Sequence, residues 1–268
     1  MSVEGERPLV FEVCVDSLTS LEAALAAGAE RVELCAARAV GGLTPSLGAI
    51  QAAVVRCAGR AKLHVLIRPR AGDYHYGGDE VDLMEEDVAL TKAAGADGVV
   101  IGALDVHGTI DVATCRRLVA RARPLQVTFH RAFDATPDPL ASLAEVAKLG
   151  VDRLLSSGGA TDALTGAAVL AELVRRAGDE LVVMAGGGIT EDNVACLVER
   201  SAVREVHFSG RSTPPGGARV EDEELAARLV CIMASARRGG CVEVDGQDAL
   251  AASPRSPGEP RRGAGWAT

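Results

Sequence analysis

Aromatic residues are scarce in this chain of 268 residues, in which Phe, Trp and Tyr together make up only 3%. Hydrophobic residues nevertheless account for 48% of the sequence. The core must therefore be built mainly from Ala, Val, Leu and Ile. A chain of this length with that much apolar material fits one large α/β domain.

Acidic residues outnumber basic residues in this chain. The net charge is −9, and no basic stretch occurs before the C-terminal tail. This argues against nucleic acid as the main partner, because such proteins present Lys and Arg patches. No run of about 18 apolar residues occurs, and the N-terminal MSVEGERP lacks the apolar segment of a signal peptide. We therefore expect a cytoplasmic protein without a membrane span.

The seven cysteines form no CxxC motif. Their odd number and wide spacing predict reduced thiols rather than a disulfide framework. Cys196 falls in a helical pattern, where we expect it to pack, and Cys241 falls in the C-terminal tail.

Short β-rich runs alternate with helical patterns along most of the chain. The predicted strands cover residues 9–15, 31–35, 63–68, 98–102, 125–130, 152–156, 181–185 and 204–209. The predicted helices cover residues 18–27, 46–58, 80–94, 111–122, 138–149, 163–177, 190–200 and 221–236. Eight such units predict a TIM (β/α)8 barrel in a single domain. The alternative is an open doubly wound sheet, but no GxGxxG follows the first strand.

Three segments share one pattern that supports this count: GAERVEL at 28–34, GADGVVI at 95–101 and GVDRLLS at 150–156. In each, glycine ends a helix and a strand follows. We place the barrel at residues 9–236, after a short N-terminal extension at 1–8. Residues 237–268 are rich in Gly, Pro, Arg and Ser, and we predict a disordered tail there.

Alternate residues of a strand face opposite sides of a sheet, so polar residues at alternate positions mark the barrel interior. Glu12 and Cys14 share this face on the first strand, and Glu33 and Cys35 share it on the second. Further inward positions on later strands are His64, Leu66, Arg68, Gln126, Thr128, His130, His207 and Ser209. His64 comes early in its strand, so we expect it deep in the barrel.

Burying so many polar groups is costly unless they pair or serve a ligand. One interpretation is a structural network, for example Glu12 or Glu33 with Arg68. The other is a site at the C-terminal ends of the strands, where barrel enzymes place their chemistry. The catalytic candidates are then Glu12 or Glu33 as general base, His130 or His207 as acid or base, and Arg68 on an anionic group. A divalent metal ion held by Glu and His is a further alternative.

Glycine-rich loops follow several predicted strands. In MAGGGITEDN, residues 184–193, a strand leads through glycines to a helix for which Thr190 is the expected N-cap, a geometry that exposes backbone N–H groups to an anion. Barrel phosphate sites commonly use the loops after strands seven and eight. The candidate anion-binding residues are Arg70, Ser157, Gly158, Gly187, Gly188, Ser209 and Arg211.

Several motifs resemble one known family closely. FEVCVDS, ELC, GGLTPS, PLQVTFHRAFD, GGGIT and HFSGRS occur in the order and spacing of the CutC family, over about residues 9 to 213. The resemblance implies a cytoplasmic TIM barrel that forms homo-oligomers, dimers or tetramers, and takes part in copper homeostasis. It also implies copper(I) binding through Cys14 in EVC and Cys35 in ELC, which match the cysteines assigned that role in the family. Thiolates are the ligands that Cu(I) prefers.

Three functions therefore stay open. The first is a copper-binding homeostasis protein, with the copper ion as its ligand. The second is a TIM-barrel enzyme acting on a small anionic metabolite, for example a phosphorylated one. The third is a binding scaffold without chemistry, since the barrel hosts unrelated functions.

Overall fold

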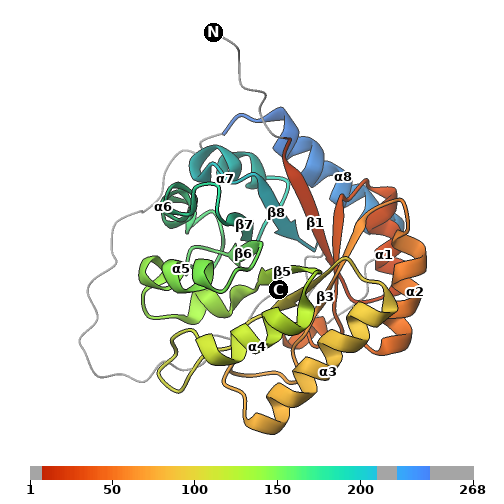
Figure 1. Cartoon of the computed structure of the whole chain (residues 1–268). Helices are drawn as coiled ribbons and strands as arrows, with labels where there is room; N and C mark the ends of the chain where they lie inside the picture. Colours follow the sequence, from red (N-terminus) through yellow and green to blue (C-terminus); the bar gives the residue numbers. More distant parts are fainter. Residues whose placement is uncertain (1–7, 210–221, 242–268) are drawn as a thin grey trace.

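The structure, a computed structural model, describes residues 8–209 and 222–241. Eight parallel strands close into a barrel in the order β1 to β8, and helices surround them (Figure 1). The strands are β1 Val10–Val15, β2 Arg31–Leu34, β3 Lys62–Leu66, β4 Gly98–Ile101, β5 Gln126–Phe129, β6 Arg153–Ser156, β7 Val182–Gly186 and β8 Glu205–Phe208. The prediction of a single-domain TIM barrel is confirmed.

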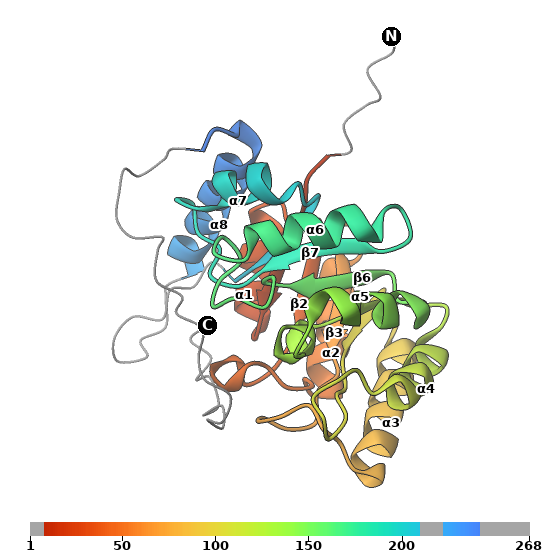
Figure 2. The ribbon, with the colours of Figure 1, turned by 90° about the vertical axis from the view of Figure 1, so that its left-hand side faces the viewer.

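The helices follow the strands in regular alternation, and Figure 2 shows α6 lying along β7. They are α1 Leu18–Ala26, α2 Leu47–Cys57, α3 Gly78–Ala94, α4 Val112–Ala122, α5 Pro139–Lys148, α6 Ala167–Ala177, α7 Val194–Ser201 and α8 Asp222–Arg238. Two short 3-10 segments, η1 Arg38–Val40 and η2 Arg131–Ala135, follow β2 and β5. No helix of the described residues is long and apolar enough to cross a membrane.

The helix ends follow local chemistry. The Ser17 side chain accepts the backbone N–H of Ser20 and begins α1, and Asp138 begins α5 in the same way ahead of Pro139. Gly95 ends α3 with φ of 94°, in the left-handed region that glycine enters without a Cβ clash. The repeated helix–glycine–strand pattern thus correctly located the joints between the units.

Helix α7 begins later than predicted. Its N-cap is Asn193, not Thr190. The Asn193 side chain accepts the Thr190 N–H at 2.9 Å and donates to the Gly188 carbonyl at 2.7 Å. These two bonds hold residues 188–193 in a turn, so the glycine loop leads into a turn and not directly into a helix.

The C-terminal region differs from the prediction in two ways. Helix α8 continues through Arg238, past the predicted boundary at 236, and the described chain ends at Cys241. Cys196 of α7 forms a disulfide with Cys241, whereas the spacing of the cysteines predicted reduced thiols. The two cysteines lie 45 positions apart in sequence, and only the docking of α8 beside α7 brings them together. The rest of the predicted tail lies outside the described residues.

The apolar core lies between the strands and the helix ring. All four Phe residues are buried in this layer, and three of them, Phe11, Phe129 and Phe133, are among its largest fully buried side chains. The barrel interior has a different composition. Glu12, Glu33, His64, Arg68 and His130 are all buried there, as the alternation predicted.

Candidate functional site

The deep part of the barrel interior holds a charged network. Arg31 on β2 forms ion pairs with both Glu12 on β1 and Glu205 on β8. Arg153 on β6 also binds Glu205, at 2.9 Å. These side chains are almost fully buried and compensate one another, so this layer has a structural role.

His64 lies in the same deep region, as expected. Its ring is fully buried, with Nδ1 4.0 Å from Glu12 Oε2. Glycine at position 98 makes room for it, because a Cβ there would lie 2.5 Å from the imidazole Nε2. Burial lowers the pKa of His64 to about 4, so the ring is neutral at pH 7.

Above this network, Glu12, Glu33 and His207 converge. The Nδ1 atom of His207 lies 2.7 Å from Glu12 Oε1 and 3.6 Å from Glu33 Oε2. One potential ligand atom from each of the three residues lies within 4.8 Å of the others. The ordinary two-residue alternation of β1, β2 and β8 directs all three into the barrel.

The two carboxyl groups of this cluster, those of Glu12 and Glu33, have different pKa values. Burial opposes ionisation of Glu12, but Arg31 and His207 hold its pKa well below the usual range. Burial raises the pKa of Glu33 to about 7. Burial would lower the pKa of His207, but Glu33, Cys14 and Glu12 raise it well above its ordinary value. The site therefore holds one fixed carboxylate and one carboxyl group that can exchange a proton near neutral pH.

The Cys14 and Cys35 thiols lie beside this cluster, with their sulfur atoms 3.8 Å apart. Both side chains extend inward from adjacent strands and pack against Leu66 and Val100. Cys35 is buried, whereas Cys14 is partly accessible. The hydrogen bond with Cys35, together with burial, raises the pKa of the Cys14 thiol well above its ordinary value. The Cys14 thiol therefore stays protonated until a cation displaces its proton.

A second polar group surrounds Tyr74, across the barrel mouth. The guanidinium of Arg68 lies 5.0 Å from the Tyr74 ring centre, and the His130 ring lies 5.1 Å from it. Arg68 donates to the carbonyls of Val40, Gly42 and Gly72 and so joins two loops. Its Nε atom and the Nε2 atom of His130 are buried without a hydrogen-bond partner among the described residues. Burial lowers the pKa of His130 to about 3.

The loop after β6 already binds an anion, but the anion is part of the protein. The Asp134 carboxylate accepts the backbone N–H of Ser157 at 3.0 Å and that of Gly159 at 3.2 Å. It also accepts the hydroxyls of Ser156 and Ser157 and pairs with Arg131. Ser157 and Gly158 thus lie where the sequence placed an anion cradle, with Asp134 as its occupant.

The remaining predicted anion-binding residues have varied surroundings. Arg70 is paired with Glu80 at 2.6 Å and with Asp73 at 3.0 Å, outside the barrel interior. At Gly187, an added Cβ would lie 3.0 Å from the Arg131 guanidinium, so this loop does face a positive charge. Ser209 is half-buried at the end of β8. Arg211 lies outside the described residues.

One residue that organises the interior, Arg31, was missed by sequence reasoning. Arg31 occupies the first position of its strand and shares the face of Glu33, so alternation alone could have found it. The role of Asp134 could not be predicted from the sequence, because Asp134 lies in η2 after the strand and reaches the next loop only in three dimensions. The proposed pairing of Glu12 or Glu33 with Arg68 is wrong, since Arg31 pairs with Glu12 and Arg68 with carbonyls.

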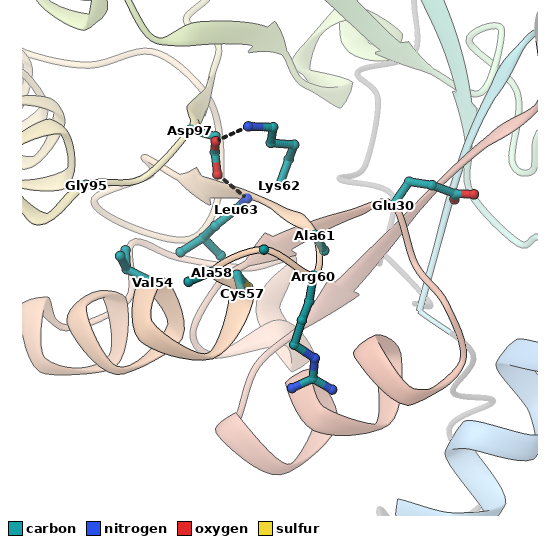
Figure 3. Close-up of a pocket in the computed structure, with 11 residues that line it drawn as sticks. Glu30, Val54, Cys57, Ala58, Arg60, Ala61, Lys62, Leu63, Gly95 and Asp97 are labelled. Atoms are coloured by element: carbon teal, nitrogen blue, oxygen red, sulfur yellow. Dashed lines mark hydrogen bonds and ion pairs between the residues drawn. The ribbon is translucent and has the colours of Figure 1, made fainter.

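A groove at the opposite end of the barrel is separate from this site. It lies where β3 begins, and Figure 3 shows the Lys62 ammonium and the Leu63 N–H both directed at the Asp97 carboxylate. In barrels of this kind the N-terminal end serves stability, whereas the chemistry lies at the C-terminal ends of the strands. The cysteine pair and His207 belong to the C-terminal end.

Comparison with known proteins gives concordant matches. The profile of the CutC family matches residues 9–212. The copper homeostasis protein cutC homolog of Homo sapiens is 44% identical over 224 residues, which cover 83% of this chain and 81% of the human protein. A CutC family protein of Xanthomonas axonopodis pv. citri is 46% identical over 201 residues, 75% of this chain and 83% of its own length. A crystal structure of a CutC protein from Streptococcus agalactiae superposes with a TM-score of 0.72 at 32% identity, covering 75% of this chain and 98% of that one.

Proposed function

This chain belongs to the CutC family of copper homeostasis proteins, and from that premise we propose that it binds Cu(I) in the cytoplasm through Cys14 and Cys35. The observation that carries the proposal is the 3.8 Å separation of the two sulfur atoms inside the barrel. Cu(I) prefers soft thiolate ligands, and Cys14 of β1 and Cys35 at the end of β2 supply two of them.

The surroundings of the pair support metal binding over simple packing. Cys14 is partly accessible, so an ion can reach the thiols from the barrel mouth. Cys115, by comparison, is fully buried and directs its sulfur at the Ala103 carbonyl, 3.7 Å away. Binding of Cu(I) releases the thiol protons, because only the thiolate is a strong ligand. We further propose that the protein acts as a homo-oligomer, a dimer or tetramer.

Competition against a Cu(I)-specific chelator under anaerobic conditions tests the proposal. The double variant Cys14→Ser, Cys35→Ser should bind Cu(I) at least 100-fold more weakly than the native protein. Cys231→Ser, which removes an exposed thiol elsewhere, is the matched control and should bind normally. Equal affinity of the double variant and the native protein would show that copper binds elsewhere or not at all.

A second candidate function is an enzyme that acts on a small anionic metabolite, such as a phosphorylated one. The observation that favours it is the pair of buried nitrogen atoms, Arg68 Nε and His130 Nε2, on either side of Tyr74. A carboxylate or phosphate there would satisfy both, and Glu33 or His207 is the candidate acid or base.

A thermal-shift screen with inorganic phosphate and simple phosphorylated metabolites tests this second function. At least one ligand should raise the melting temperature of the native protein, and the gain should disappear in His130→Gln. If none of these anions stabilises the native protein, the second function is excluded for that class of ligand.

A further inference from the structure

Glu12, Glu33 and His207 converge from three strands that closure of the barrel places side by side. Glu12 on β1 is the register partner of His207 on β8, and Glu33 lies on β2, the other neighbour of β1. His207 Nδ1 lies 2.7 Å from Glu12 Oε1 and 3.6 Å from Glu33 Oε2. One ligand atom of each residue lies within 4.8 Å of the other two. The set thus consists of two carboxylates and one imidazole, without sulfur.

The separations within this set suit a single bound cation. Oxygen and nitrogen ligands lie about 2.1 Å from a cation such as Zn²⁺ or Mg²⁺, so two ligands of one ion lie at most about 4.2 Å apart. The two distances from His207 Nδ1 fall inside that span. A cation bound here takes the place of the proton that Nδ1 and Glu12 Oε1 share, because the metal-bound forms of both groups are deprotonated.

Arg31 orients Glu12 for such a role. The guanidinium of Arg31 binds Oε2 of Glu12, whereas Oε1 faces His207. Carboxylates that ligate metals are themselves commonly hydrogen-bonded, and this fixes their orientation. Arg31 also pairs with Glu205, to which Arg153 binds as well. Two arginines and two glutamates therefore balance one another in the deep layer of the barrel.

Glu33 lies outside that balance. Only 5% of the residue is exposed, yet no side chain or backbone N–H of the described part of the chain donates a hydrogen bond to its carboxylate. Its ion-pair contact is the His207 ring, at 3.6 Å. A buried carboxylate without a hydrogen bond gains more from a cation than one that is already bound to arginine. Glu33 is thus the member of the set that most requires a positive ion.

We propose that Glu12, Glu33 and His207 form a site for a divalent cation of the manganese class, separate from the thiol pair. Such cations take carboxylate and imidazole ligands, whereas Cu(I) selects soft thiolates. The proposal does not depend on copper binding, because no cysteine belongs to the set. Three protein ligands leave at least one coordination position for water or for a ligand, as in catalytic and not in structural metal sites.

The burial of the three residues gives an entry path. The His207 side chain is partly accessible, whereas Glu12 and Glu33 are buried behind it. A cation can therefore reach the imidazole first and complete its coordination with the two carboxylates.

Titration of the full-length protein with Mn²⁺, followed by electron paramagnetic resonance, tests the proposal. Mn²⁺ is the probe because it favours oxygen ligands over thiolates, and because the six-line signal of free Mn²⁺ is lost on binding. The native protein should bind one equivalent. Glu33→Gln and His207→Gln should each weaken binding at least tenfold. His64→Gln, which changes another buried barrel histidine outside the set, is the matched control and should bind Mn²⁺ as the native protein does.

Thermal unfolding distinguishes a metal ligand from a residue with a structural role only. Mn²⁺ should raise the melting temperature of the native protein and not that of Glu33→Gln. Without metal, Glu33→Gln should be at least as stable as the native protein, because the substitution removes a buried carboxyl group that no hydrogen bond compensates. If Glu33→Gln lowers the melting temperature and Mn²⁺ has no effect on the native protein, Glu33 is only a structural partner of His207 and the proposal is wrong.

The outcomes separate this site from the copper site. Cys35→Ser should weaken Cu(I) binding and leave Mn²⁺ binding unchanged. If the native protein leaves the free Mn²⁺ signal intact, or if Glu33→Gln binds Mn²⁺ as the native protein does, the site is wrong, whatever the Cu(I) result. If Mn²⁺ binds as expected while the chelator retains all Cu(I), the copper proposal fails and this site stands. Circular dichroism identifies any variant that does not fold, and Glu33→Gln carries the test if His207→Gln fails to fold.

Discussion

His207 and Glu12 face each other across the β1–β8 pairing, with 2.7 Å between Nδ1 of the ring and Oε1 of the carboxylate. The two residues are 195 positions apart in sequence. Their contact forms where the last strand closes the barrel against the first. The same seam holds the accessible thiol of Cys14, so closure of the barrel assembles the candidate metal site.

The Arg31 network below that contact should be essential for stability. Arg31→Met leaves the buried carboxylates of Glu12 and Glu205 without their shared cation. We expect a loss of about 3–5 kcal/mol in the free energy of unfolding, measured by urea denaturation. Arg117→Met, which removes an exposed ion-pair partner, should leave the free energy of unfolding nearly unchanged. Equal losses would show that the buried pairs contribute no more than surface pairs.

Glycine at position 98 should be required by the His64 ring. Gly98→Ala places a Cβ 2.5 Å from His64 Nε2 in a filled interior, so we expect a destabilisation of about 1–3 kcal/mol. In a His64→Ala background the same substitution should lower the free energy of unfolding only slightly, because the imidazole ring that the new Cβ would meet is absent. A double-mutant cycle in urea measures the coupling, and an equal cost in both backgrounds would contradict the packing argument.

His130 should make the protein less stable in mild acid. Its pKa is about 3 in the folded protein and about 6.5 in an unfolded chain, so the unfolded state binds the extra proton below pH 6.5. Stability is therefore lost as the pH falls from about 6.5 toward 3. Between pH 7 and pH 5 this residue alone should account for about 2 kcal/mol.

Urea denaturation at both pH values checks the His130 prediction. His130→Gln should lose about 2 kcal/mol less than the native protein over this interval. His107→Gln is an exposed control in the loop after β4 and should leave the difference unchanged. A native protein and a His130→Gln variant with the same pH dependence would mean that His130 titrates normally.

Asp134 should prevent binding of free anions by the loop after β6. Asp134→Ala removes the carboxylate and leaves the N–H groups of Ser157 and Gly159 facing an empty position beside Arg131. We expect a lower melting temperature, which inorganic phosphate raises more than chloride does at equal ionic strength. Asp162→Ala, in the loop before α6, is the control and should show no such preference. If phosphate affects the native protein and the Asp134→Ala variant equally, the loop is not an anion site.

Strand alternation predicted much of the candidate site. Glu12, Cys14, Glu33, Cys35 and His207 all face the interior, as a period of two requires. The roles within that set could not be predicted in the same way. Whether Glu12 binds a metal or supports His207 depends on Arg31, and the position of Arg31 relative to Glu12 depends on the β1–β2 register.

The sequence by itself determined the eight β/α units, their glycine joints and the inward face of each strand, because these depend on periodicity and on the conformational freedom of a few residues. Only the tertiary structure decided that Asp134 occupies the loop after β6, that α7 begins after Asn193, and that Cys196 meets Cys241. It also decided which inward residues are partners. Barrel closure and register set those distances, and both depend on packing summed over all eight strands and not on any local segment.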